Sequence, residues 1–125
     1  MEVRNLKLDD VVPDELKLGF ENAPQTAYEW IWVVERDGKI VAMLVTAPAH
    51  LVVILLRIKA TREAEGLDVR ALMIHAFRAF KTRGYKGYLT WLDPTKAPEN
   101  AFIGIIRAME GTQLLDPQVA CCGKL

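Results

Sequence analysis

The chain has 125 residues, 51% of them hydrophobic, so it is long enough to bury one core and short for two ordinary domains. Sixteen basic and sixteen acidic side chains leave no net charge, which argues against a protein that holds nucleic acid through a long-range positive field. We therefore expect residues 1–125 to form a single domain with no nucleic-acid partner.

The amino-terminal residues favour a strand followed by a helix. Along Glu2–Leu8 the residues Val3, Asn5 and Lys7 alternate with Arg4, Leu6 and Leu8, which predicts a partly buried first strand. Asp9 or Asp10 suits a helix start because a carboxylate accepts hydrogen bonds from free amides there, and Pro13 suits a first helical turn. We expect this helix to end near Asn22.

Three strands are predicted next. Tyr28–Arg36 is rich in aromatic and β-branched residues, and Lys39–Ala47 repeats that pattern. Asp37 and Gly38 between them form a dipeptide typical of a two-residue hairpin turn. Leu51–Ala60 is an almost continuous apolar run, which predicts a central strand covered on both faces.

One segment, Ile40–Ile58, is long and apolar enough to suggest a transmembrane alternative. Pro48 and His50 interrupt it near its centre, and its β-branched residues favour two strands joined at Ala47–His50. We expect no membrane-spanning segment.

The second half alternates helices and strands. Apolar residues recur every three or four positions over Asp68–Arg83, which predicts a helix with one buried stripe that Gly84 ends. Lys86–Leu92 is a predicted strand and Pro98–Glu110 a second helix. A short pair follows at Thr112–Leu115 and Val119–Cys122.

Antiparallel strands followed by a β-α-β-α order predict an α/β fold with a mixed central sheet and helices on both faces. The change from antiparallel to parallel pairing should fall between Leu51–Ala60 and Lys86–Leu92. Ligands of α/β folds bind in crevices at the carboxyl ends of strands at such a point.

Cysteine and histidine carry little functional signal. Cys121 and Cys122 are adjacent, which is awkward for a disulfide, so we expect reduced thiols. The start of the chain lacks the basic and apolar regions of a secretory signal, which favours the cytoplasm. His50 and His75 have no ligand partners at metal spacing, so no metal is expected. The tryptophans are interpreted as core and pocket-wall residues: Trp30, Trp32 and Trp91.

From Gly66 to Gly111 a glycine turn runs into a helix, then a strand, then a second helix, in which Asn100, Ile103 and Ile106 keep a fixed spacing. This order and these residues resemble the coenzyme A-binding half of the GNAT acyltransferase superfamily. The resemblance implies a GNAT-like fold and transfer of an acyl group from acyl coenzyme A to a primary amine.

The family's phosphate turn reads Arg or Gln, two residues, Gly, one residue, then Gly or Ala, so that amides can approach a pyrophosphate. Glu63 to Asp68 occupies that register here, with Gly66 matching and Asp68 departing. Asp68 is either a helix N-cap or a charge that opposes a phosphate by about 1 to 4 kcal/mol. Arg62 and Arg70 either offset it or are solvated.

The second family motif places a tyrosine seven residues after an asparagine, where it protonates the departing thiolate. Asn100 and Gly111 keep the spacing, but Arg107 stands at the tyrosine position, and a guanidinium is a poor proton donor. A general base is also missing from the predicted strand Leu51–Ala60, and Glu29 and Glu35 are weak candidates on the preceding hairpin. No catalytic residue is assigned.

The resemblance implies a β-bulge or splay near Arg57–Ala60 and a cleft beside it. Backbone groups of the cleft strand would meet the pantetheine arm, the turn would hold the phosphates, and two residues would lie at the mouth of the site. The implied coenzyme A-binding set is Ile58, Lys59, Ala60, Gly66, Leu67, Asp68, Val69, Arg70, Ala71, Asn100 and Arg107. The alternative is a GNAT-like module that has lost catalysis and serves binding or assembly. The acceptor amine stays open, as does a homodimer.

Overall fold

The computed structural model describes residues 1–17, 24–91, 95–96, 99–107, 112–115 and 120–124. In this part of the chain a seven-stranded mixed sheet has the order β1-β2-β3-β4-β5-β7-β6. Its strands are β1 (Glu2–Asn5), β2 (Ile31–Arg36), β3 (Lys39–Ala49), β4 (Val52–Ala60), β5 (Gly87–Trp91), β6 (Thr112–Leu115) and β7 (Ala120–Lys124). The helices are α1 (Gly66–Thr82) and α2 (Glu99–Arg107), with 3₁₀ turns η1 (Asp14–Leu16) and η3 (Gln25–Trp30).

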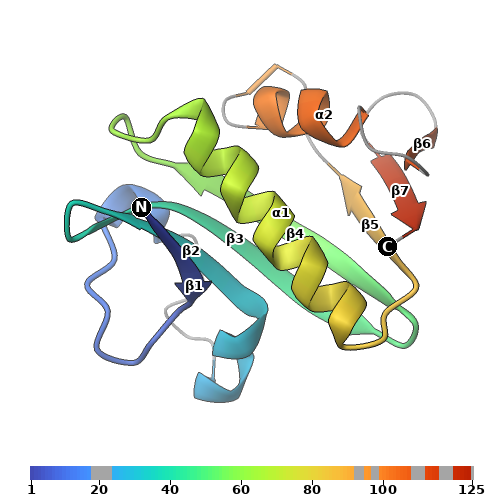
Figure 1. Ribbon diagram of the computed structural model, residues 1–125, viewed down its shortest axis with the longest axis horizontal. Helices are drawn as coiled ribbons and strands as arrows, with labels where there is room; N and C mark the ends of the chain where they lie inside the picture. Colours follow the sequence, from blue (N-terminus) through green and yellow to red (C-terminus); the bar gives the residue numbers. More distant parts are fainter. Residues whose placement is uncertain (18–23, 92–94, 97–98, 108–111, 116–119, 125) are drawn as a thin grey trace.

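The sheet is mixed, as the sequence predicts. β4 and β5 pair in parallel, whereas every other neighbouring pair among the described strands is antiparallel. The crossover between β4 and β5 is α1, which lies across one face of the sheet with α2 beside it (Figure 1). The switch in pairing therefore falls between the two predicted strands.

The β2–β3 hairpin is the most local of the confirmed predictions. Asp37 and Gly38 both have positive φ, at 52° and 76°, as a two-residue turn that matches the strand twist requires. β3 runs on through Pro48, and His50, with φ 57°, turns the chain into β4. The long apolar segment is thus two antiparallel strands, and no helix in the described residues is long and apolar enough to cross a membrane.

Two core clusters lie on opposite faces of the sheet, because side chains alternate along each strand. The larger cluster joins Trp32 and Val34 of β2 to the apolar stripe of α1. The smaller cluster contains Ile31 and Val33 of the same strand, and it is closed by Leu16 of η1, which is fully buried. Helical structure therefore covers both faces, although only one face carries α-helices in the described residues.

Three predicted boundaries are wrong in the amino-terminal region. β1 ends at Asn5 rather than Leu8, and Tyr28–Trp30 belongs to the 3₁₀ turn η3 rather than to the next strand. The helix expected after Asp9 or Asp10 is replaced, within residues 9–17, by the single turn η1. The rest of that prediction, through Asn22, lies outside the described residues, as do parts of the predicted elements at residues 92, 98, 108–110 and 119.

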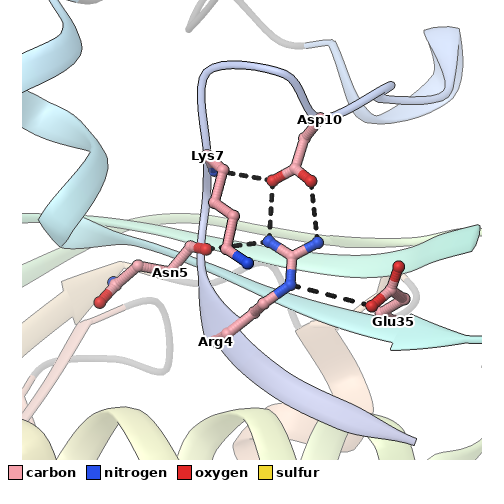
Figure 2. A network of polar contacts seen from close by, with 5 residues as sticks. All are labelled: Arg4, Asn5, Lys7, Asp10 and Glu35. Atoms are coloured by element: carbon pink, nitrogen blue, oxygen red, sulfur yellow. Dashed lines mark hydrogen bonds and ion pairs between the residues drawn. The ribbon is translucent and has the colours of Figure 1, made fainter.

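The reason for the missing helix start is an ion-pair network (Figure 2). Asp10 accepts hydrogen bonds from Arg4 Nη1 and Nη2, both at 2.8 Å, and from the backbone amide of Lys7 at 2.7 Å. Arg4 also reaches Glu35, with Nε 3.9 Å from Oε2. The Asp10 carboxylate thus caps a turn that precedes it instead of a helix that follows it.

Replacing Asp10 with alanine should lower the free energy of unfolding by about 2 kcal/mol, because two charged hydrogen bonds and a turn contact are lost at a nearly buried site. Urea denaturation measures this. The neighbouring Asp9→Ala, at an exposed position, is the matched control and should change stability by less than about 0.5 kcal/mol. Equal effects in the two variants would contradict the role given to Asp10.

Candidate active site

A β-bulge interrupts β4 at Leu56. Val45 and Thr46 are consecutive on β3, but they pair with Arg57 and Leu55 on β4, so Leu56 is an extra residue. The sequence resemblance placed the irregularity at Arg57–Ala60. The bulge is confirmed and begins one residue earlier.

The described pairing of β4 with β5 ends at the same point. Their parallel register runs from Val52 beside Gly87 to Leu55 beside Thr90. At this last pair the buried Thr90 hydroxyl donates to the Leu55 carbonyl at 3.2 Å. β4 then continues to Ala60 with partners on β3 alone among the described residues. The two strands are therefore adjacent and parallel, and among the described residues their pairing ends midway along β4.

Beyond Leu55 no described strand pairs with the β5 side of β4, and we call this stretch the free edge of β4. Its backbone groups have known directions. The amide of Thr61 donates to Val41 on β3 at 2.8 Å. Backbone groups of successive strand residues point to alternate sides, so those of Lys59 also face β3, whereas those of Ile58 and Ala60 face the separation from β5. Of the three predicted backbone contacts, Ile58 and Ala60 have the required direction and Lys59 does not.

The turn after β4 leads into the amino terminus of α1, which begins at Gly66. Glu65 is the N-cap, and Asp68 completes a capping box by accepting a hydrogen bond from the Glu65 amide at 2.8 Å. Asp68 is therefore a capping residue, as the structural alternative proposed, but at the third helical position rather than at the N-cap itself.

Asp68 is also the partner of Arg36 at the end of β2. Arg36 donates to both carboxylate oxygens of Asp68, from Nη2 at 2.6 Å and from Nε at 3.1 Å. Its Nη2 also lies 3.7 Å from Glu65 Oε2. The Asp68 side chain is fully buried. These bonds from Arg36 hold the pKa of Asp68 below its ordinary value, while burial opposes the shift.

A pocket of about 380 Å³ lies between the end of β4 and the first turns of the two α-helices. It brings together four residues of the predicted coenzyme A set: Ala60, Gly66, Val69 and Asn100. Arg62, which the sequence suggested as a possible phosphate contact, also lines the pocket. The remaining lining residues were not predicted, and they are Glu15, Thr61, Ala64, Glu65 and Ala101. Residues far apart in the sequence can line one pocket, and no local sequence pattern indicates that Glu15 of η1 lies near the start of α1.

Gly66 has a specific place in this pocket. Its φ is outside the left-handed region, and a Cβ built on it would meet no atom within 4 Å. Neither backbone strain nor packing therefore demands glycine here, although glycine is less favourable than alanine in a helix. The open space in front of Gly66 would allow a bound molecule to approach the helix amides closely.

The other predicted residues are more scattered. The side chain of Ile58 is in the larger core cluster, while Leu67 and Arg70 are exposed on the first turns of α1 and Ala71 is half-buried there. Arg107 is the last residue of α2, and its side chain lies outside the described part. These assignments stay predictions.

Neither candidate base lies at the cleft. The carbonyl of Glu29 accepts from Arg83, just beyond the carboxyl end of α1, and the carbonyl of the next residue accepts from Thr46 on β3, so Glu29 lies across β3 from β4. Glu35 lies on β2, two strands away from β4, and it faces Arg4.

Solved structures of several N-acetyltransferases share this architecture. Ard1 from Thermoplasma volcanium matches with a TM-score of 0.67 and 10% identity over 99% of this chain and 97% of its own. The PaiA N-acetyltransferase from Thermoplasma acidophilum, in complex with coenzyme A, matches with a TM-score of 0.63 and 13% identity over 76% of this chain. The match spans only 60% of the PaiA chain. No protein-family profile or curated protein matches the sequence.

The chain has the GNAT fold. In the GNAT phosphate turn the position of Asp68 normally holds a glycine or alanine, so the resemblance suggested a carboxylate opposed to a phosphate. The structure corrects this reading, because the Asp68 carboxylate is paired with Arg36 and turned into the protein. Arg36 could not be foreseen as its partner, since it lies 32 residues away in the sequence.

Replacing Asp68 with alanine should lower the free energy of unfolding by about 2 to 3 kcal/mol, since the capping bond and the paired carboxylate are both lost. The lowered pKa means that this contribution is present above the unfolded-state pKa of about 3.9 and is lost as pH falls through the folded-state pKa. The difference between wild type and Asp68→Asn should therefore shrink on acidification.

Urea denaturation at neutral and acidic pH tests both statements. The exposed Asp14→Ala is the control for removing a carboxylate and should leave stability within about 0.5 kcal/mol of wild type. An Asp68→Ala variant as stable as wild type would show that the Arg36 pair does not hold the start of α1.

Proposed function

We propose that the chain binds acyl coenzyme A along the free edge of β4 and transfers the acyl group to an amine. The end of the β4–β5 pairing carries this proposal, because in the described residues it leaves backbone groups of β4 without a strand partner, and these lead to the pocket at the start of α1. The acetyltransferases of the same fold, one of them with coenzyme A bound, support it.

The pantetheine arm would take the place of a neighbouring strand. It contains two amide groups, and the outward backbone groups of Ile58 and Ala60 are spaced two residues apart, as strand pairing requires. Because the bulge at Leu56 ends the pairing with β5, the arm would reach as far as Leu55 and Thr90 before meeting closed sheet. The thioester would then lie at the bulge.

The phosphates would lie at the amino terminus of α1. The first amides of a helix have no intrahelical acceptor, and the helix dipole favours an anion there. Arg62 lines the pocket and Arg70 is exposed one turn into the helix, so both can meet a phosphate. Glu65 opposes an anion, although its carboxylate is 3.7 Å from Arg36. We expect weak to moderate affinity for this reason.

In the transfer step the neutral amine nitrogen attacks the thioester carbonyl carbon. The carbon–nitrogen bond forms, the carbon–sulfur bond breaks, the ammonium loses a proton and the thiolate gains one. Residues 39–62 and 86–91, which include β3, β4 and β5, contain no aspartate or glutamate to accept the proton. Water would accept it, so transfer should be slow and should accelerate as pH approaches the pKa of the acceptor amine.

A binding module without catalysis is the second candidate. The observations that favour it are Arg107 at the proton-donor position and the placement of Glu29 and Glu35 away from the cleft. Both candidates share the coenzyme A site, so binding and turnover must be measured separately.

Replacing Gly66 with alanine should weaken coenzyme A binding about tenfold while stability stays the same or rises, because the added methyl group enters open space that the ligand would fill. Isothermal calorimetry and urea denaturation measure the two quantities. Thr82→Ala, at the opposite end of α1, is the control and should change neither. Unaltered affinity in Gly66→Ala would place the phosphates elsewhere.

Replacing Arg107 with tyrosine should raise the rate of thiol release from acetyl coenzyme A by about 100-fold, because it supplies a general acid at the family position. A thiol-detection assay over a panel of primary amines checks this for wild type and variant. Rapid turnover by the wild type would contradict the non-catalytic candidate. An absence of turnover in both proteins, with coenzyme A bound, would leave the binding module.

A further inference from the structure

The face of the sheet opposite α1 is open beside the bulge. Leu56 is 51% exposed and Trp91 is 56% exposed, which is unusual for large apolar side chains. They are the next residues along β4 and β5 after the last parallel pair, Leu55 and Thr90, whose side chains are both buried. At the bulge Leu56 and Arg57 both stand opposite Val45, which packs on the face away from α1, and Trp91 follows the inward-facing Thr90. Leu56 and Trp91 therefore lie on the face away from α1, on neighbouring strands.

Two more apolar residues continue this surface. Ile54 and Leu89 are directly paired one step back along the same strands and are half-buried. The coenzyme A pocket is reached from the helix ends, where Gly66 and Asn100 lie. The open apolar surface is therefore on the other side of the cleft, where a second substrate can approach the bulge without displacing the first.

This surface is bordered by positive charge. Arg57 pairs across β3 with Val45 and Lys59 pairs with Met43, and both of these β3 residues pack with the smaller core cluster on the face opposite α1. Directly opposed residues of an antiparallel pair share a face, so the two cations lie on the same side as the exposed leucine and tryptophan. Arg57 is exposed and follows Leu56 directly.

No negative charge belongs to these strands. Residues 39–62 and 86–91 contain no aspartate or glutamate, so neither cation has a carboxylate partner from β3, β4 or β5. A ligand here would meet an apolar wall and two cations. A simple amine, itself a cation, would be repelled by this charge, whereas a carboxylate close to the amine would be attracted.

Resting on the proposed transfer reaction, we infer that the acceptor is an amine whose molecule also carries a carboxylate and a large apolar group. The apolar group packs on Leu56 and Trp91, and the carboxylate pairs with Arg57 and Lys59. This places the class of acceptor among apolar amino acids or peptides with a free carboxylate near the amine, and it excludes polyamines and lysine-like cations.

The test uses amide products, which need no catalysis to bind. N-acetyl-L-phenylalanine carries the amide, the ring and the carboxylate, whereas N-acetylphenethylamine lacks only the carboxylate. The wild type should bind the first about tenfold more tightly than the second, by calorimetry with coenzyme A present and again without it. The indole NMR signal of Trp91 should shift with both compounds.

Arg57→Ala combined with Lys59→Ala should remove the preference and leave the affinity for N-acetylphenethylamine unchanged. Arg78→Ala, which removes an exposed arginine of α1, is the matched control and should keep the preference. Equal binding of the two compounds by the wild type would overturn the inference, as would a preference that survives in the double variant. If the wild type keeps the preference for N-acetyl-L-phenylalanine but does not bind coenzyme A, the proposed function is contradicted instead.

Discussion

The start of α1 is held by one ion pair between distant parts of the chain. Arg36 ends β2 and Asp68 lies in the first turn of α1. Their two hydrogen bonds fix the amino terminus of α1 beside the carboxyl ends of β2 and β4. A buried carboxylate is tolerated because Arg36 and the Glu65 amide satisfy it together. The pocket depends on this placement, since Gly66 and Val69 line it from the same turn.

This ion pair changes how the departure from the family pattern is understood. An acidic residue in a phosphate turn suggests a lost site if its charge faces the ligand. Here the carboxylate faces the protein, and Gly66 keeps open space at the helix amides. A buried aspartate paired with Arg36 thus stands where the family pattern has a small residue. Catalysis is a separate matter. Arg107 and the lack of a carboxylate on β3, β4 and β5 affect the proton transfers rather than the binding of acyl coenzyme A.

Local signals in the sequence predicted the elements that depend on short-range chemistry. The turn at Asp37 and Gly38 follows from the positive φ that both residues adopt, and α1 follows from its apolar periodicity. The bulge came from the family resemblance and was misplaced by one residue. The structure groups Ala60, Gly66, Val69 and Asn100 of the predicted set, since the motif spacing reflects the fold around them.

The predictions that were wrong concern residues whose positions depend on contacts between distant parts of the chain, or on competition between two hydrogen-bonding partners within a turn. Asp10 was expected to begin a helix, but the guanidinium of Arg4 offers its carboxylate two charged hydrogen bonds, which outweigh a capping preference of about 1 kcal/mol. Glu29 and Glu35 satisfied a search for carboxylates, but sheet order places them away from the cleft. Charge alone could not reveal which side of the sheet they face.

Amide NMR during a titration with coenzyme A shows directly whether the ligand lies along the free edge of β4. We expect the largest amide shifts at Ile58, Ala60, Gly66 and Leu67, with a smaller shift at Lys59, whose amide faces β3. Shifts confined to other regions, or a stronger response at Lys59 than at both of its neighbours, would contradict this placement.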